Sequence, residues 1–119
     1  MTEWTPSDII LGADGYPSDE ELETVRTWPV RSAADLTAAF EYVHRRWNWT
    51  DWGWHRASHR RREYRGAHLR RAYRISTGGW SGNESLIGAM QDNWMLWALT
   101  WRSSRVGGHY EFSIDEEMK

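Results

Sequence analysis

The chain contains no cysteine, and Lys119 is the only lysine among its fifteen cationic residues. The absence of cysteine excludes a disulfide framework, a cysteine-ligated metal site and a thiol nucleophile. No stretch approaches the roughly 18 consecutive apolar residues of a transmembrane helix. The opening residues, MTEWTPSDII, lack the basic and apolar regions of a signal peptide. We therefore expect a cytoplasmic protein in a reducing environment.

Proline and phenylalanine are also scarce, whereas tryptophan is abundant. The 119 residues include three prolines, two phenylalanines and ten tryptophans. A chain of this length has the size of one domain, and each tryptophan can bury a large apolar area. We expect a single domain over residues 1–119 with an aromatic core.

Charge is segregated along the chain, although the net formal charge is only −2. Residues 1–43 carry nine acidic and two basic side chains, and residues 44–74 carry ten arginines against two carboxylates. Residues 75–119 carry six acidic and three basic side chains. Arginine pairs with phosphate and carboxylate and stacks on aromatic rings. A negatively charged partner and internal pairing between the acidic and basic parts both fit this pattern.

Two helices are predicted over residues 18–47, after an irregular arm at residues 1–17. Ser18 and Glu21 have the spacing of a capping box, and the proline that follows the first helix ends it. The second helix begins after Ser32 and carries one apolar stripe. The stripe consists of Leu36, Phe40, Val43 and Trp47. We expect both helices to be packing elements, because neither gathers reactive groups.

The later part of the chain is predicted to form a β-α-β-β unit over residues 67–115. Its elements are a strand over 68–77, a helix over 83–93, a central strand over 94–102 and, after a glycine turn, an edge strand over 109–115. The expected fold class is α+β, with the two N-terminal helices packed on a small sheet that contains this unit. Residues 48–66, rich in tryptophan and arginine, fit either a strand with a loop or a basic helix.

The segment RISTGGWSGNESL at residues 74–86 combines a strand end, a glycine loop and a helix start. Three glycines in five positions allow a sharp turn, and Ser81 with Glu84 has capping-box spacing. Free backbone N–H groups at a helix N-terminus can bind an anion. We expect the N–H groups of Gly79, Trp80 and Ser81 to face such an anion, although the glycines also fit a purely structural turn.

A parallel β-α-β crossover would bring this loop beside the segment SSRVGG at residues 103–108. Ligands of open α/β sheets bind at the carboxyl ends of the strands. Arg102 and Arg105 would attract phosphate or carboxylate, and Trp80 would stack on a base. The predicted ligand-binding residues are Thr77, Gly78, Gly79, Trp80, Ser81, Gly82, Asn83, Arg102, Ser103, Ser104, Arg105 and His109.

Motifs for catalysis and metal binding are weak. The chain has no GxxxxGK[ST] or GxGxxG sequence. In the segment GWSGN, Asn83 occupies the position where a GxSxG nucleophile motif requires glycine. His55 and His59 have the i, i+4 spacing of metal ligands, but two ligands do not make a site and nearby arginines repel a cation. We expect no catalytic residue, no metal ion and no cofactor.

A second surface is predicted in the arginine-rich segment. Arginines interleaved with aromatic rings are typical of proteins that bind single-stranded nucleic acid. The pI of about 6.2 is low for such proteins, and the acidic flanks favour instead a contact with a nucleic-acid-binding protein. The arginines of this predicted partner or nucleic-acid surface are Arg56, Arg60, Arg61, Arg62, Arg65, Arg70 and Arg71.

Three blocks, ISTGGWSGNESLIGAM, WMLWALTW and SSRVGGHYEFSID, resemble a family of small bacteriophage and prophage proteins that share a TGGWSGNE-type block. PSDEELETVRTW and LTAAFEYVHRRW are similar too, so the resemblance covers about residues 16–115. The arginine-rich stretch at residues 55–71 departs from the pattern. The resemblance implies a viral origin and transfers no catalytic residue.

The leading hypothesis is a small phage accessory protein that acts by binding in the cytoplasm of the host bacterial cell. Its expected ligand is a phosphate-bearing small molecule, with a nucleotide as the best candidate, at the paired glycine loops. Inhibition of a bacterial defence protein by direct contact is one alternative. Binding of single-stranded nucleic acid through the arginine and tryptophan segment is another, and no membrane partner is expected.

Overall fold

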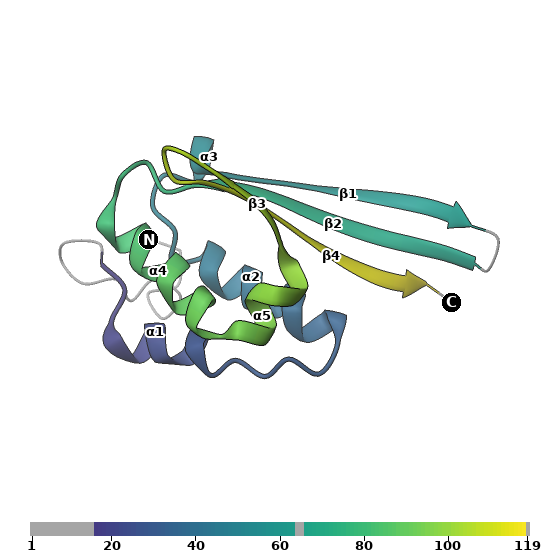
Figure 1. Cartoon of the computed structure of the whole chain (residues 1–119), viewed down its shortest axis with the longest axis horizontal. Helices are drawn as coiled ribbons and strands as arrows, with labels where there is room; N and C mark the ends of the chain where they lie inside the picture. The colour runs from purple at the N-terminus through teal and green to yellow at the C-terminus, as the bar shows by residue number, and fades with distance from the viewer. Residues whose placement is uncertain (1–15, 64–65, 119) are drawn as a thin grey trace, which may run out of the picture.

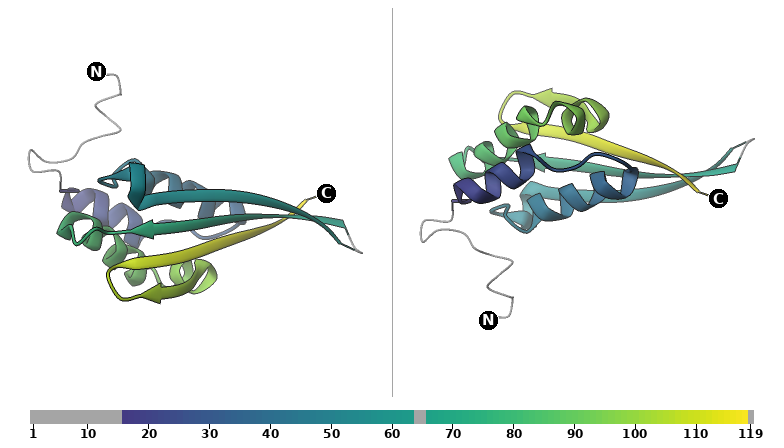
Figure 2. Two further views of the ribbon diagram at one scale, coloured as in Figure 1. Left: turned by 90° about the horizontal axis from the view of Figure 1, so that it is seen from above. Right: turned by 90° about the horizontal axis from the view of Figure 1, so that it is seen from below.

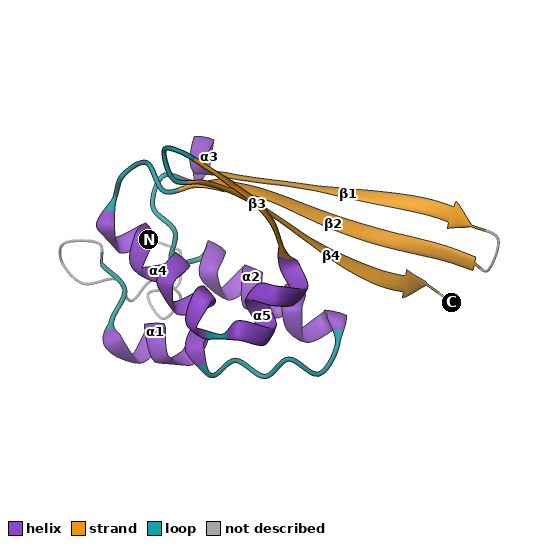
Figure 3. Cartoon of the chain, viewed as in Figure 1, coloured by secondary structure: helices purple, strands orange, loops and turns teal. Residues whose placement is uncertain are grey.

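The structure is a computed structural model that describes residues 16–63 and 66–118 (Figures 1 and 3). Residues 1–15 of the predicted arm, and Arg65 of the predicted partner surface, lie outside the described residues. The elements are α1 (Asp19–Arg26), α2 (Ala33–His44), α3 (Thr50–Gly53), β1 (Trp54–Glu63), β2 (Gly66–Ser76), α4 (Ser81–Asp92), α5 (Trp94–Thr100), β3 (Trp101–Arg105) and β4 (His109–Met118). These elements confirm the predicted α+β class.

The four strands form one sheet in the order β1-β2-β4-β3, and each neighbouring pair is antiparallel. Strands β2 and β3 are both antiparallel to β4, so they run in the same direction with β4 between them. This order corrects the predicted β-α-β-β unit, in which the two parallel strands were neighbours and the last strand lay at the edge. The carboxyl ends of β2 and β3 nevertheless lie at the same end of the sheet.

Helices α1, α2, α4 and α5 lie on one side of the sheet, and the other face carries, among the described elements, only the short helix α3 at the start of β1 (Figures 1 and 2). We call it the open face. The far ends of β1, β2 and β4 extend beyond the helices, which gives the molecule a longest dimension of 51 Å. Side chains alternate along a strand. Each strand therefore contributes one row to the core and one row to the open face. Within the described ranges, no helix is both long and apolar enough to cross a membrane.

Both N-terminal helices begin at the predicted caps. The Ser18 hydroxyl accepts a bond from the Glu21 N–H, and the Glu21 carboxylate accepts one from the Ser18 N–H. The Ser32 side chain accepts a bond from the Asp35 N–H. Each cap satisfies N–H groups that have no partner inside the helix. The capping predictions for these two helices are confirmed.

The core lies between α2 and the centre of the sheet. The fully buried ring of Phe40 stacks on Tyr73 of β2 at 4.5 Å and meets Phe112 of β4 edge-on at 5.2 Å. Trp47 and Trp54 are the described tryptophans that are buried in this core. The core is therefore aromatic, as expected, but Trp49, Trp52, Trp94 and Trp101 are exposed by 39% or more and lie outside it.

The predicted central strand over residues 94–102 is wrong, because residues 94–100 form helix α5. Asn93 caps this helix, since its side chain accepts a bond from the Leu96 N–H. The amide group of Asn93 also donates to the carbonyl oxygens of Val25 and Trp28, each at 3.0 Å. These bonds connect α5 to the end of α1. The apolar run is therefore a helix with one exposed face, and only its last residue enters β3.

The predicted capping box at the start of α4 is also wrong. The helix begins at Ser81, Trp80 occupies the cap position, and no side chain caps the helix there. The Ser81 hydroxyl instead forms a hydrogen bond with the hydroxyl of Tyr16. For residues 48–66, where a strand and a helix were both open, the structure gives the short helix α3 followed by β1, which pairs with β2.

Candidate ligand-binding site

The two predicted loops meet at the carboxyl ends of β2 and β3. The Thr77 N–H donates to the Gly108 carbonyl oxygen at 3.0 Å. A Cβ atom on Gly108 would lie 2.2 Å from the Thr77 hydroxyl oxygen, so glycine permits the close approach. The juxtaposition was expected from a parallel crossover, but the structure produces it through β4, because Gly108 directly precedes His109, the cross-strand partner of Ser76.

Two backbone donors of the glycine loop bond within the loop. The Gly79 N–H donates to the Thr77 hydroxyl at 3.3 Å, and the Trp80 N–H donates to the Thr77 carbonyl at 3.1 Å. The Thr77 hydroxyl in turn donates to the Glu84 carboxylate at 3.4 Å, which places a negative charge at the start of α4. The N–H groups of Gly79 and Trp80, two of the three that were expected to face an anion, therefore already have partners in the structure.

Asn83 and Gly82 serve packing. The fully buried Asn83 side chain accepts from the Asn48 N–H at 2.9 Å and donates to the carbonyl oxygens of Asn48 and Thr77. A Cβ atom on Gly82 would lie 2.5 Å from the Trp80 indole nitrogen. Both residues fix the loop and the segment after α2, and neither is among the lining residues of the cavity beside the loops.

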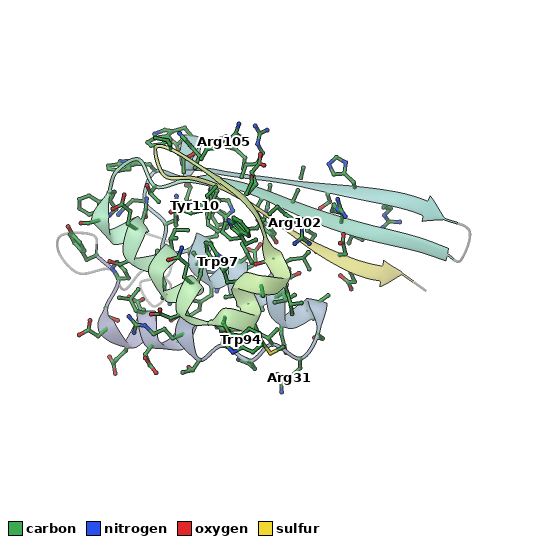
Figure 4. All side chains as sticks on the ribbon, viewed as in Figure 1. Arg31, Trp94, Trp97, Arg102, Arg105 and Tyr110 are labelled. Carbon is green, nitrogen blue, oxygen red and sulfur yellow. The ribbon has the colours of Figure 1, made fainter. Side chains whose placement is uncertain are left out.

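A hollow of about 550 Å³ lies on the open face of the sheet, beside the two loops. We call it the sheet hollow. It is lined by Trp52, His55, Arg74, Ile75, Ser76, Arg105, Val106, His109, Tyr110 and Glu111. Of the predicted ligand residues, Arg105 and His109 line it. Arg105 lies above the sheet in Figure 4, whereas Tyr110 and Trp97 lie toward the helices.

The remaining predicted residues of β3 lie outside the sheet hollow. The Ser103 hydroxyl donates to the Glu111 carboxylate at 2.7 Å, and the Ser104 hydroxyl accepts from the Trp101 indole N–H at 2.8 Å. Arg102 points along the sheet, with its guanidinium 4.0 Å from the Asp115 carboxylate. Ser104 and Arg102 therefore make their contacts away from the hollow, whereas Ser103 holds the Glu111 carboxylate that lines it.

Trp52 forms the aromatic wall of the sheet hollow, a role predicted for Trp80. The Trp52 ring is 51% exposed and stacks on Trp49 at 5.9 Å with an interplanar angle of 15°. A Cβ atom on Gly78, whose φ is +65°, would lie 2.5 Å from the Trp52 ring. Trp80 packs against Tyr16 and Trp49 instead. The glycine loop thus provides the surface on which Trp52 rests.

Two guanidinium groups give the sheet hollow its positive charge. Glu111 lies between Arg74, at 3.5 Å, and Arg105, at 3.4 Å. Each guanidinium carries five N–H donors, and Glu111 meets one nitrogen of each. The Arg74 and Arg105 side chains are 71% and 64% exposed, so their other donors remain accessible from the hollow. The carboxylate therefore orients both cations without neutralising them.

A hydrogen-bonded pair of polar side chains lies between the strands at the same place. The Ser76 hydroxyl oxygen is 2.7 Å from Nδ1 of His109. The two residues are direct cross-strand partners on β2 and β4. On the other side of the hollow, Nε2 of His55 is 2.8 Å from the Trp52 carbonyl oxygen. These contacts fix both rings at the edge of the cavity.

The arginines of the predicted partner surface do not form one patch. Arg56 pairs with Glu41 of α2 and Arg71 with Glu116, whereas Arg70 lies on the open face and pairs with Asp115 at 2.7 Å. The hydrogen bond and charge of Asp115 raise the pKa of Arg70 above its usual value. Arg60 is exposed on β1. Strand β1 also includes Arg61 and Arg62, but the structure describes only the backbone of these two residues. Strand alternation therefore distributes the described arginines over both faces.

Sequence reasoning assigned Ser76 to no site, and it considered Trp52 and Arg74 only as part of the arginine- and tryptophan-rich segment, not beside the glycine loops. The only signal that could have found them is the pairing of β1 with β2, which places His55 opposite Arg74. Among the residues that the structure describes, no group of three or more His, Asp or Glu side chains could hold a metal ion. No family model, curated protein or solved structure matches this chain.

Proposed function

We propose that the chain binds a phosphate-bearing small molecule with a flat ring, best represented by a nucleotide, in the sheet hollow. The observation that supports this most directly is the presence of one exposed indole face and two partly free guanidinium groups around one cavity. An indole ring stacks on a base, and guanidinium donors match phosphate oxygens. The proposal keeps the ligand class expected from sequence and moves the site from the glycine loop to the sheet.

Each lining group has a distinct role in this proposal. Trp52 contacts the ring of the ligand, and Arg74 with Arg105 binds the phosphate. The Ser76 and His109 pair lies between them, where hydroxyl and imidazole groups can bind a sugar or a second phosphate. With the resemblance to phage proteins, we extend the proposal to an accessory role of a viral protein in the cytoplasm of a bacterial host.

Calorimetric titration with nucleoside mono-, di- and triphosphates tests the proposal, and inorganic pyrophosphate tests the phosphate contacts alone. We expect Arg105→Gln to weaken binding by roughly tenfold or more, since a hydrogen bond to a charged group contributes about 1.5–3 kcal/mol. Arg102→Gln is the matched control, because Arg102 lies on the same strand but outside the sheet hollow. Equal losses in the two variants, or no binding of any nucleotide, would contradict the proposal.

Trp52→Leu separates the ring contact from the phosphate contact. We expect this variant to weaken nucleotide binding and to leave pyrophosphate binding unchanged. A single-stranded oligonucleotide serves as the comparison ligand. If it binds more tightly than every mononucleotide and is released by salt, the open face is a nucleic-acid surface and the small-molecule proposal fails.

A further inference from the structure

Exposed apolar side chains cover one face of α5 and the start of β3. Trp94 is 72% exposed, Met95 41%, Leu99 48% and Trp101 39%. Ala98 is exposed between them. We call these five residues the α5 surface. The helix sequence WMLWALT contains no charged residue, so nothing on α5 itself interrupts the apolar face.

The opposite face of α5 is firmly anchored. Leu96 and Thr100 are fully buried, and the Trp97 ring meets Phe112 of β4 at 5.4 Å. The helix also lies at the edge of the helical layer, beside β3 (Figure 2). Its apolar side chains are therefore held outward by a rigid support. Trp94 lies on the side of the helices away from the sheet (Figure 4).

The α5 surface is as large as the largest apolar patch of a typical monomer. It offers on the order of 500 Å², because a tryptophan side chain alone presents about 150–250 Å² when fully exposed. The largest apolar patch of a typical monomer is about 300–600 Å² and is often functional. Tryptophan is also enriched among the residues that dominate binding energy in protein interfaces. The α5 surface therefore has the composition and size of an interface core.

We propose that the α5 surface is the contact of a symmetric homodimer, in which α5 of one copy packs on α5 of a second copy. An uncharged face meets its own copy without repulsion, whereas it gives a charged partner nothing to pair with. Two such surfaces bury on the order of 1,000 Å², which is the lower limit for a specific interface. Twofold symmetry is the commonest arrangement of protein oligomers.

The surroundings of the α5 surface fit the same contact. Among the described strands β3 pairs only with β4, so its outer edge is free next to α5. A free strand edge is usually covered, and a dimer through α5 would cover it. Asp92 lies at one end of the α5 surface and Arg102 at the other, which supplies a polar rim of the usual kind. The inference does not depend on the proposed ligand.

Sedimentation of the full chain tests the dimer directly. We expect the chain to be dimeric at about 100 μM, because this concentration lies above the micromolar Kd of a weak specific interface. Leu99→Glu should weaken it on the order of 100-fold or more, because two unpaired carboxylates would be buried. Val106→Glu is the matched control, since Val106 is fully exposed in the turn after β3. A monomer at every concentration, or equal effects of the two substitutions, overturns the proposal.

Because the chain has no cysteine, a single engineered thiol gives a second test that leaves the interface intact. We expect Ala98→Cys to form an intermolecular disulfide rapidly under mild oxidation, since Ala98 lies within the α5 surface. Ala38→Cys is the control, because Ala38 is also exposed but lies on α2. Cross-linking of the two variants at the same rate would show that the contact is not at α5 and would overturn the proposal.

Discussion

The Thr77 N–H donates a hydrogen bond of 3.0 Å to the Gly108 carbonyl oxygen, which extends the pairing of β2 with β4 by one residue beyond Ser76 and His109. Gly108 has a φ of +78° and lies so close to Thr77 that a Cβ atom would be 2.2 Å from the threonine hydroxyl oxygen. The junction beside the sheet hollow therefore depends on glycine for two separate reasons.

Gly108→Ala should destabilise the protein more than Gly79→Ala. Both glycines have positive φ, which costs an alanine about 1–2 kcal/mol. A Cβ atom on Gly79 would meet nothing within 4 Å, whereas one on Gly108 would overlap Thr77 and add about 1–3 kcal/mol. Urea denaturation of both variants measures the difference. Equal losses of stability would show that the contact with Thr77 relaxes freely.

Asn93→Asp should be nearly as harmful as Asn93→Ala, although aspartate is a good helix cap. The aspartate keeps an acceptor for the Leu96 N–H, but it loses both donors to the carbonyl oxygens of Val25 and Trp28. We expect each variant to lose about 2–4 kcal/mol, since buried carbonyl groups are left without partners. If Asn93→Asp retains the stability of the unsubstituted chain in urea denaturation, capping alone is what matters at this position.

Arg46→Met should be among the most destabilising substitutions of an arginine. Arg46 and Glu21 form a pair at 2.8 Å, and each side chain is only 8% exposed. Removing one partner of a buried pair costs about 3–5 kcal/mol, because the other charge stays buried. Adding Glu21→Gln to Arg46→Met should restore part of this loss, since the glutamine keeps an acceptor for the Ser18 N–H. Thermal unfolding compares the single and double variants.

Arg31→Met is the control for this pair. Arg31 pairs with Asp35 at 3.0 Å, but its side chain is 77% exposed. Exposed ion pairs contribute little, because water already solvates both charges. A large loss of stability in Arg31→Met, or no rescue of Arg46→Met by Glu21→Gln, would show that burial of the charges does not cause the loss at Arg46.

His44 should make the protein less stable at mildly acidic pH. Burial against Trp54, on which the imidazole stacks at 4.8 Å, lowers the pKa of His44 below its usual 6.5. The unfolded chain then binds a proton that the folded chain rejects, so stability falls as the pH drops below 6.5. The loss from this group is at most about 1.4 kcal/mol per pH unit. His44→Phe keeps a stacked ring and should show a flatter stability profile between pH 7.5 and 5. Identical profiles would remove His44 as the cause.

The parts of the fold that were predicted correctly have local chemical causes. Ser18 and Ser32 begin their helices through bonds to residues three positions later. Residues 106–108 form the expected turn, and both of its glycines, Gly107 and Gly108, have positive φ. The sequence pattern was sufficient in these places because every interacting group lies within a few residues.

The parts that were predicted wrongly depend on distant contacts. Asn93 caps α5 while holding the end of α1, and an eight-residue apolar run carries no periodicity that separates such a helix from a buried strand. The sheet hollow likewise joins Trp52, Arg74 and Arg105 from three separate segments. Only the strand register brings them together, so Arg105 and His109 could be predicted from the loops while the other lining residues could not.

The central position of β4 has a consequence for the order in which the protein can form. Phe112 and Ile114, both buried, belong to residues 109–118, and β4 supplies the partner of both β2 and β3. Before these residues are synthesised, a nascent chain can make the β1–β2 hairpin and its helices, but β3 has no strand to join. Completion of the sheet during synthesis must therefore wait for β4, and a chain stalled before residue 109 would leave the inner faces of its helices and hairpin exposed to chaperones and proteases.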